Sequence, residues 1–91
     1  MINLITLTDK KDNKIALVGD RCYKDSDIVT ITTIDGDTMR ISDVDDVTVE
    51  TVEYDDIRVD EALQMTAELV YRQNARDMQR MELAFALAEF N

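Results

Sequence analysis

Hydrophobic and polar residues follow two different periods along this chain, and the change falls near residue 57. Before it, apolar and β-branched residues alternate with polar ones, as in strands with one buried face. After it, apolar residues recur every three or four positions, which places them on one side of a helix. The 91 residues are therefore predicted to form a single α+β domain, with a sheet over residues 1–57 and a helical part over residues 58–91.

Five segments of the first part are predicted strands joined by local turns. They are Ile2–Thr8, Lys14–Val18, Ile28–Ile34, Asp37–Ser42 and Val47–Tyr54. Gly19–Asp27 has no period and is predicted to be a loop. The pair Asp35-Gly36 is predicted to form a tight hairpin turn, because both residue types tolerate positive φ angles. The order of the strands favours a small antiparallel meander, or one that curls into a partly closed barrel.

The last predicted strand contains a change of face. Val47 and Val49 share one side of the strand, whereas Val52 and Tyr54 share the other. One extra residue would bring all four to the same side, so a β-bulge is predicted near Glu50-Thr51.

One apolar stripe runs through the helical part, after Asp60 as the expected N-cap. It consists of Leu63, Ala67, Val70, Asn74, Met78, Met81, Phe85 and Ala88. The stripe contains neither glycine nor proline, which predicts one long helix from Asp60 to Phe90. The alternative is a break near Gln73–Arg76, where the apolar signal thins.

A helix of that length would span about 45 Å and would overhang so small a sheet. Met81–Phe90 is apolar around most of its circumference, and such a surface marks an interface in a soluble protein. A homo-oligomer, most simply a dimer, is predicted. Its candidate interface residues are Val70, Asn74, Met78, Met81, Leu83, Phe85, Leu87 and Phe90. Two alternatives stay open: the segment folds back over the sheet as ordinary core, or it docks a different protein.

The charge of the chain is strongly negative, at −10 with twenty acids, ten bases and no histidine. Such a field repels nucleic acid and anionic membranes, so direct binding to either is not expected. Between residues 35 and 56 nine acids accompany one base, Arg40. These nine are the candidate partner-binding face: Asp35, Asp37, Asp43, Asp45, Asp46, Glu50, Glu53, Asp55 and Asp56. A basic protein surface is the predicted partner, and the alternative is a solvated face that only keeps the chain soluble.

Signatures of catalysis and of cofactor binding are missing. Without histidine there is no Ser-His or Cys-His pair and no histidine metal site. Two glycines are too few for a glycine-rich phosphate loop. The run Asp43–Asp46 lacks the spacing of a calcium loop. No enzymatic activity, cofactor or metal is predicted.

Two further features have structural interpretations. Cys22 lies between Arg21 and Lys24, which would favour a reactive thiolate, but with no base nearby a free structural thiol is predicted. Arg72, Arg76 and Arg80 form a ladder that is predicted to pair with acids, beginning with Glu68, four residues before Arg72.

The location and role follow as expectations. The N-terminus lacks the pattern of a signal peptide and no segment is apolar enough to span a bilayer, so a cytoplasmic protein is expected. The leading hypothesis is a non-enzymatic acidic binding protein, of the kind that phages and mobile elements encode as inhibitors. It would occupy a nucleic-acid-binding surface of a target protein in the host cytoplasm. The alternative is a structural module that assembles through its C-terminal helix.

Overall fold

The computed structural model describes residues 1–75 and 81–88, apart from the side chains of Phe85 and Ala88, and within these ranges the chain forms seven strands and two helices. Their bounds are β1 Ile2–Thr8, β2 Lys14–Gly19, β3 Arg21–Asp25, β4 Ile28–Thr32, β5 Thr38–Ser42, β6 Asp46–Val52, α1 Ile57–Ala75, β7 Met81–Glu82 and α2 Leu83–Ala88. The predicted α+β order, with the sheets first and the helical part after them, is confirmed. Neither helix is long and apolar enough in its described residues to cross a membrane.

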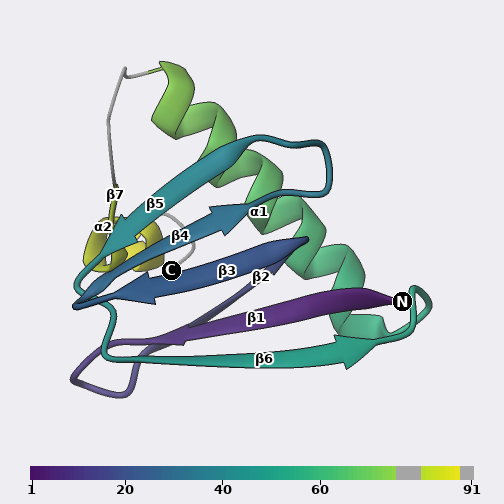
Figure 1. Ribbon diagram of the computed structural model, residues 1–91, viewed down its shortest axis with the longest axis horizontal. Coiled ribbons are helices and arrows are strands. Elements are labelled where there is room, and N and C mark those ends of the chain that lie inside the picture. The colour runs from purple at the N-terminus through teal and green to yellow at the C-terminus, as the bar shows by residue number, and fades with distance from the viewer. Residues whose placement is uncertain (76–80, 89–91) are drawn as a thin grey trace.

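Strand β1 lies at the centre of the first of two open sheets. This sheet has the order β2-β1-β6, and the second has the order β3-β4-β5-β7 (Figure 1). One face of β1 presents Ile5 and Leu7 to the main core, which it shares with the second sheet. The other face presents Ile2 and Leu4 to a smaller core with α1. Both faces of the first sheet are therefore covered, which explains why so many residues of β1 are buried.

Gly19 lies at the corner where β2 passes into β3 with only Asp20 between them. A Cβ at this position would lie 2.8 Å from Cγ2 of Ile31 and 3.0 Å from the carbonyl oxygen of Thr32. Only glycine lets the chain pass this close to β4 while it moves from one sheet to the other. The prediction of a loop over Gly19–Asp27 is wrong. Residues 21–25 show no apolar period because they are mostly exposed at a sheet edge, yet they pair with β4.

A turn at Asp35-Gly36 is confirmed, but it is longer than predicted, since β4 ends at Thr32 and β5 begins at Thr38. Strands β4 and β5 pair antiparallel, the amide of Gly36 donates to the carbonyl oxygen of Thr33 at 3.0 Å, and Gly36 has a φ of 92°. The positive φ is the conformation that glycine adopts at no steric cost.

The bulge predicted near Glu50-Thr51 is wrong, because β1 and β6 pair in one unbroken register from Thr8–Asp46 to Ile2–Val52. Val47 packs against the main core, and Val52 lies on the opposite face against α1. A sheet covered on both faces accepts apolar residues on both sides of a strand, so the change of face needs no extra residue.

Helix α1 begins one turn earlier than predicted, at Ile57. Its N-cap is Asp56 and not Asp60, since the Asp56 Oδ1 atom accepts a hydrogen bond from the Arg58 amide at 2.9 Å. The helix is fixed to the first sheet by Thr66. The hydroxyl of Thr66 accepts the Val18 amide at 2.9 Å and donates to the Ala62 carbonyl oxygen at 2.7 Å. A strand amide at the edge of β2 thereby gains a partner from the helix.

The prediction of one helix reaching Phe90 is wrong, and the alternative of a break near residues 73–76 is confirmed: α1 ends at Ala75. Met81 then pairs in parallel with Ile41 of β5, and the short helix α2 follows. Met81 and Leu83 are fully buried in the main core, so they offer no surface to a second copy. For these residues the fold-back alternative describes what happens, because the small core gains apolar cover from them.

Candidate functional site

The nine acids predicted to form one docking face lie in three separate groups. Asp35 and Asp37 lie in the β4–β5 turn, Asp43, Asp45 and Asp46 lie between or at the ends of β5 and β6, and Glu50, Glu53, Asp55 and Asp56 follow toward α1. Strand β5, about 17 Å long at about 3.3 Å per residue, separates the first group from the second. The third group continues along β6, where Asp46 and Glu50 are four residues and about 13 Å apart. The first group is therefore a local site apart from the other two.

Two acids of the third group are bound to Arg58. The guanidinium donates to Asp56 at 2.8 and 3.0 Å and to Glu50 at 3.0 and 3.3 Å. The hydrogen bond from the Arg58 side chain is the main cause that lowers the pKa of Asp56 to about 2. Glu50 and Asp56 thus hold the start of α1 against β6, which is a structural role.

The other seven acids have no such partner. The ion pairs in the described part of the chain involve Asp20, Glu50, Asp56 and Glu68 as acids. Within these residues seven carboxylates form no ion pair and accept no hydrogen bond. They belong to Asp35, Asp37, Asp43, Asp45, Asp46, Glu53 and Asp55. Most of the predicted negative face is therefore available to another molecule.

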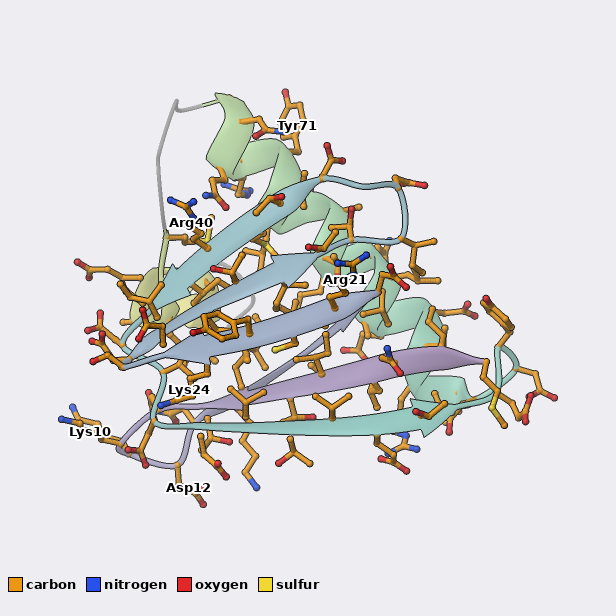
Figure 2. The ribbon with its side chains drawn as sticks, in the orientation of Figure 1. Lys10, Asp12, Arg21, Lys24, Arg40 and Tyr71 are labelled. Carbon is orange, nitrogen blue, oxygen red and sulfur yellow. The ribbon has the colours of Figure 1, made fainter. Side chains whose placement is uncertain are left out.

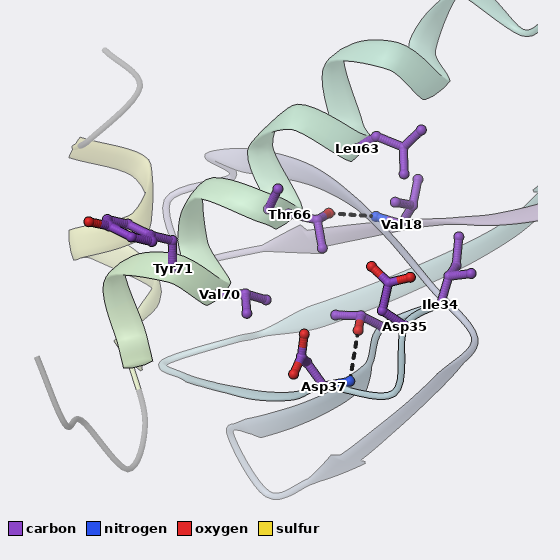
Figure 3. Close-up of a pocket in the computed structure, with 10 residues that line it drawn as sticks. Val18, Ile34, Asp35, Asp37, Leu63, Thr66, Val70 and Tyr71 are labelled. Carbon is purple, nitrogen blue, oxygen red and sulfur yellow. Dashed lines mark hydrogen bonds between the residues drawn. The ribbon is translucent and has the colours of Figure 1, made fainter. Parts of the chain in front are cut away.

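A groove with a cavity of about 260 Å³ lies between α1 and the β4–β5 turn (Figure 3). We call it the α1 groove. Its lining residues are Val18, Thr33, Ile34, Asp35, Asp37, Leu63, Thr66, Ala67, Val70 and Tyr71. The first acidic group thus lies beside apolar side chains, and both carboxylates project from the turn toward the helix (Figure 3).

The helical wall of the α1 groove includes Leu63, Ala67 and Val70, the first three residues of the apolar stripe predicted from the sequence. The residues of α1 that are buried are Val59, Ala62, Thr66, Leu69 and Gln73. The stripe residues Leu63, Ala67 and Val70 lie next to them, on the open side of the helix. Leu63 is 39% exposed, Ile34 on the opposite wall is 52% exposed, and Tyr71 is 70% exposed. These apolar side chains are only partly covered by the chain itself.

The polar groups on the groove walls differ in whether they are already bonded. Thr33 Oγ1 accepts the amide of Asp37 at 3.0 Å, and Thr66 is bonded to Val18 and Ala62. The carboxylates of Asp35 and Asp37 remain, and these are the groups that can bind a ligand. Sequence reasoning identified both acids but not the groove, because the walls come from segments about thirty residues apart.

A second hollow, with a cavity of about 490 Å³, lies at the opposite end of β4 and β5, near the β1–β2 turn. It is lined by Asp9, Lys10, Lys11, Asn13, Asp27, Asp43, Val44, Ala84 and Leu87. Lys10, Asp12 and Lys24 are at the same end of the molecule (Figure 2). Acids and lysines alternate around it, so its charges offset one another and it does not define a ligand of either sign.

The other residues predicted for the oligomer interface lie in different surroundings. Val70 is half-buried at the α1 groove, Asn74 is exposed, and Leu87 is half-buried against the main core. Met78 and Phe90, and the side chain of Phe85, lie outside the described residues.

The structure also places the thiol and the first residue of the arginine ladder. Cys22 packs against the main core, and burial raises its pKa, which disfavours the thiolate. Arg72 pairs with Glu68 at 3.0 Å, as predicted, while Arg76 and Arg80 lie outside the described residues. Among residues 1–75 and 81–88 no three or more potential ligand side chains gather in a way that could hold a metal ion.

Comparison of the chain with protein-family models, with curated proteins and with solved structures finds no match. Its function is therefore inferred from its own residues.

Proposed function

We propose that this chain is a non-enzymatic acidic protein that docks on a basic surface of another protein. The observation that carries the proposal is the set of seven carboxylates that have no partner among the described residues, in a chain of net charge −10. Glu50 and Asp56 are bonded to Arg58, whereas the other seven acids keep a charge that no described contact neutralises. Charges of one sign that are left exposed attract a partner of the opposite sign over several ångströms.

The kind of target follows from the same charge. A basic surface that attracts several separate acidic groups at once is typical of proteins that bind nucleic acid. The chain would compete with that nucleic acid, as inhibitors from phages or mobile elements do. Under this proposal the α1 groove makes the close contact, and the second and third acidic groups raise the rate of encounter.

Capture of the target with tagged protein, followed by affinity measurements at different salt concentrations, tests the proposal. Exposed charges are screened by salt, so we expect the affinity to fall by about tenfold or more between about 50 and 300 mM salt. Nucleic acid bound by the target should be displaced by this chain. An affinity that stays constant across this range would contradict the proposal.

A structural module that assembles with its own copies is the second candidate, and a different surface favours it. Met1, Tyr54 and Ile57 are 74%, 64% and 91% exposed, and all three lie at the end of the molecule where β6 leads into α1 (Figure 1). Light scattering of the purified chain distinguishes this candidate. A mass above one chain that Ile57→Asp reduces to one chain supports it, and a single chain before the substitution excludes it.

A further inference from the structure

We infer that the α1 groove binds an arginine side chain of the target protein, presented from an exposed segment of that protein. This inference rests on the proposed function and names the group that the groove would recognise. It joins three observations: two carboxylates without a partner in the described part of the chain, partly exposed apolar walls, and a cavity that fits a single side chain.

The carboxylates decide the charge of the ligand. Asp35 and Asp37 both face the groove from the β4–β5 turn, and no described residue supplies a cation to either (Figure 3). The turn itself is fixed by bonds from backbone atoms and from Thr33, so the carboxylates are not needed to hold it. A cation is the complementary ligand for them.

The walls decide what carries the cation. Ile34, Leu63, Ala67 and Val70 present hydrocarbon around the two acids. A bare metal ion or a hydrated cation gains nothing from such walls, whereas the long aliphatic stem of arginine or lysine covers them and keeps its charged end at the carboxylates. The cavity of about 260 Å³ is smaller than the roughly 300–1,000 Å³ of sites for drug-sized ligands. One anchoring side chain therefore fits better than a whole small molecule.

Arginine fits the two carboxylates better than lysine does. A guanidinium has five donors in a planar fork and loses less hydration when it is partly buried, whereas an ammonium is a compact, strongly hydrated charge. The chain contains its own example, because Arg58 binds Glu50 and Asp56 at the same time. An arginine on a partner would repeat this arrangement in the α1 groove.

Nuclear magnetic resonance titration with short blocked peptides tests the inference. The probes are acetyl-Gly-Leu-X-Leu-Gly-amide with arginine, lysine or citrulline as X, since citrulline keeps the shape of arginine and removes its charge. We expect the arginine peptide to shift the amide signals of residues 33–37 and 63–71. The lysine peptide should bind more weakly, and the citrulline peptide should produce no shifts there.

Two double variants of equal charge separate the groove from the overall field. Asp35→Asn with Asp37→Asn should weaken the binding of the arginine peptide by about tenfold or more. Asp43→Asn with Asp45→Asn, at the other end of β5, should change it by less than about twofold, because exposed charges at that distance are screened. Unchanged circular dichroism spectra and melting temperatures confirm that both variants are folded.

The inference is overturned if citrulline binds as tightly as arginine, if both double variants weaken binding equally, or if the shifts fall on residues 43–46. Its failure differs from failure of the proposed function. If the captured target still binds with a strong dependence on salt while the arginine peptide does not bind the groove, the inference alone is wrong. If the affinity for the target does not change with the salt concentration, the proposed function is wrong.

Discussion

The two flanks of α1 contrast in composition and in role. The flank that faces the sheets consists of Val59, Ala62, Thr66, Leu69 and Gln73 and includes two polar residues. The adjacent flank at the α1 groove carries Leu63, Ala67, Val70 and Tyr71, and it is partly exposed, although Val70 also packs against the main core. An apolar flank that the chain leaves partly exposed has surface to offer a partner.

The acids show the same contrast between groups that serve the fold and groups that remain available. Glu50 and Asp56 are bonded to Arg58 and hold the start of α1 in place. Asp35 and Asp37 lie beside the apolar flank without a cation in the described residues. Both contrasts support our proposal that the α1 groove contacts another molecule.

Truncation of one leucine on each flank should give the largest difference in stability. Leu69 is fully buried in the main core, so Leu69→Ala should lower the free energy of unfolding by about 2–5 kcal/mol, because it removes apolar contacts and leaves a cavity. Leu63→Ala, on the groove flank, should cost less than about 1 kcal/mol. Urea denaturation followed by circular dichroism measures both, and equal losses would contradict the assignment of the flanks.

Removal of the Thr66 hydroxyl should have the next largest effect. Thr66→Val leaves the buried amide of Val18 without its acceptor, which should cost about 1–3 kcal/mol in the free energy of unfolding. Thr66→Ser keeps the hydroxyl and is the matched control, with a smaller loss expected from the missing methyl group. Should the valine variant be as stable as the serine variant, the bond between α1 and β2 would not fix the helix.

The difference between local patterns and long-range contacts explains what the sequence could and could not predict. The α+β order and the Asp-Gly turn follow from local patterns, which depend on residues close together in the chain. The buried flank of α1 escaped prediction because Thr66 becomes a core residue only through Val18, which is 48 residues away. The same reason hid β3, whose exposed residues are ordered by pairing with β4.

Prediction of the candidate site had the same limits. Asp35 and Asp37 were predicted as binding residues from the density of acids, and the structure places them at the α1 groove. Glu50 and Asp56 belonged to the same set, but Arg58, just beyond the acidic segment, binds both. The prediction that the helix extends past Ala75 failed because the pairing of Met81 with Ile41 is a tertiary contact, which a local pattern does not show.

Acid titration should give the smallest effect and separates the paired acids from the unpaired ones. The folded pKa of Asp56, about 2, lies below its ordinary value of 3.8, so its stabilising effect is complete above about pH 4 and is lost as the pH falls toward 2. Asp9 contributes in the same direction, since hydrogen bonds from Asn13 lower its pKa. Asp56→Asn should therefore lose less stability than the unmodified chain between pH 7 and pH 3.

The control for this titration is Asp35→Asn, which removes the same charge from a residue that has no bonded partner in residues 1–75 and 81–88. Urea denaturation at the two pH values gives the comparison. If Asp35→Asn reduces the loss at pH 3 as much as Asp56→Asn does, general charge repulsion and not the Arg58 contact governs the acid response.

Carboxyl footprinting of the chain, alone and bound to its captured target, tests the central claim most directly. The exposed acids are labelled with a carbodiimide and glycine ethyl ester, and the modified residues are identified by mass spectrometry. We expect the target to protect Asp35 and Asp37 strongly while Asp43 and Asp45 remain open to the reagent. Strong protection of Asp43 and Asp45 with Asp35 and Asp37 still labelled would contradict the assignment of the α1 groove as the binding site.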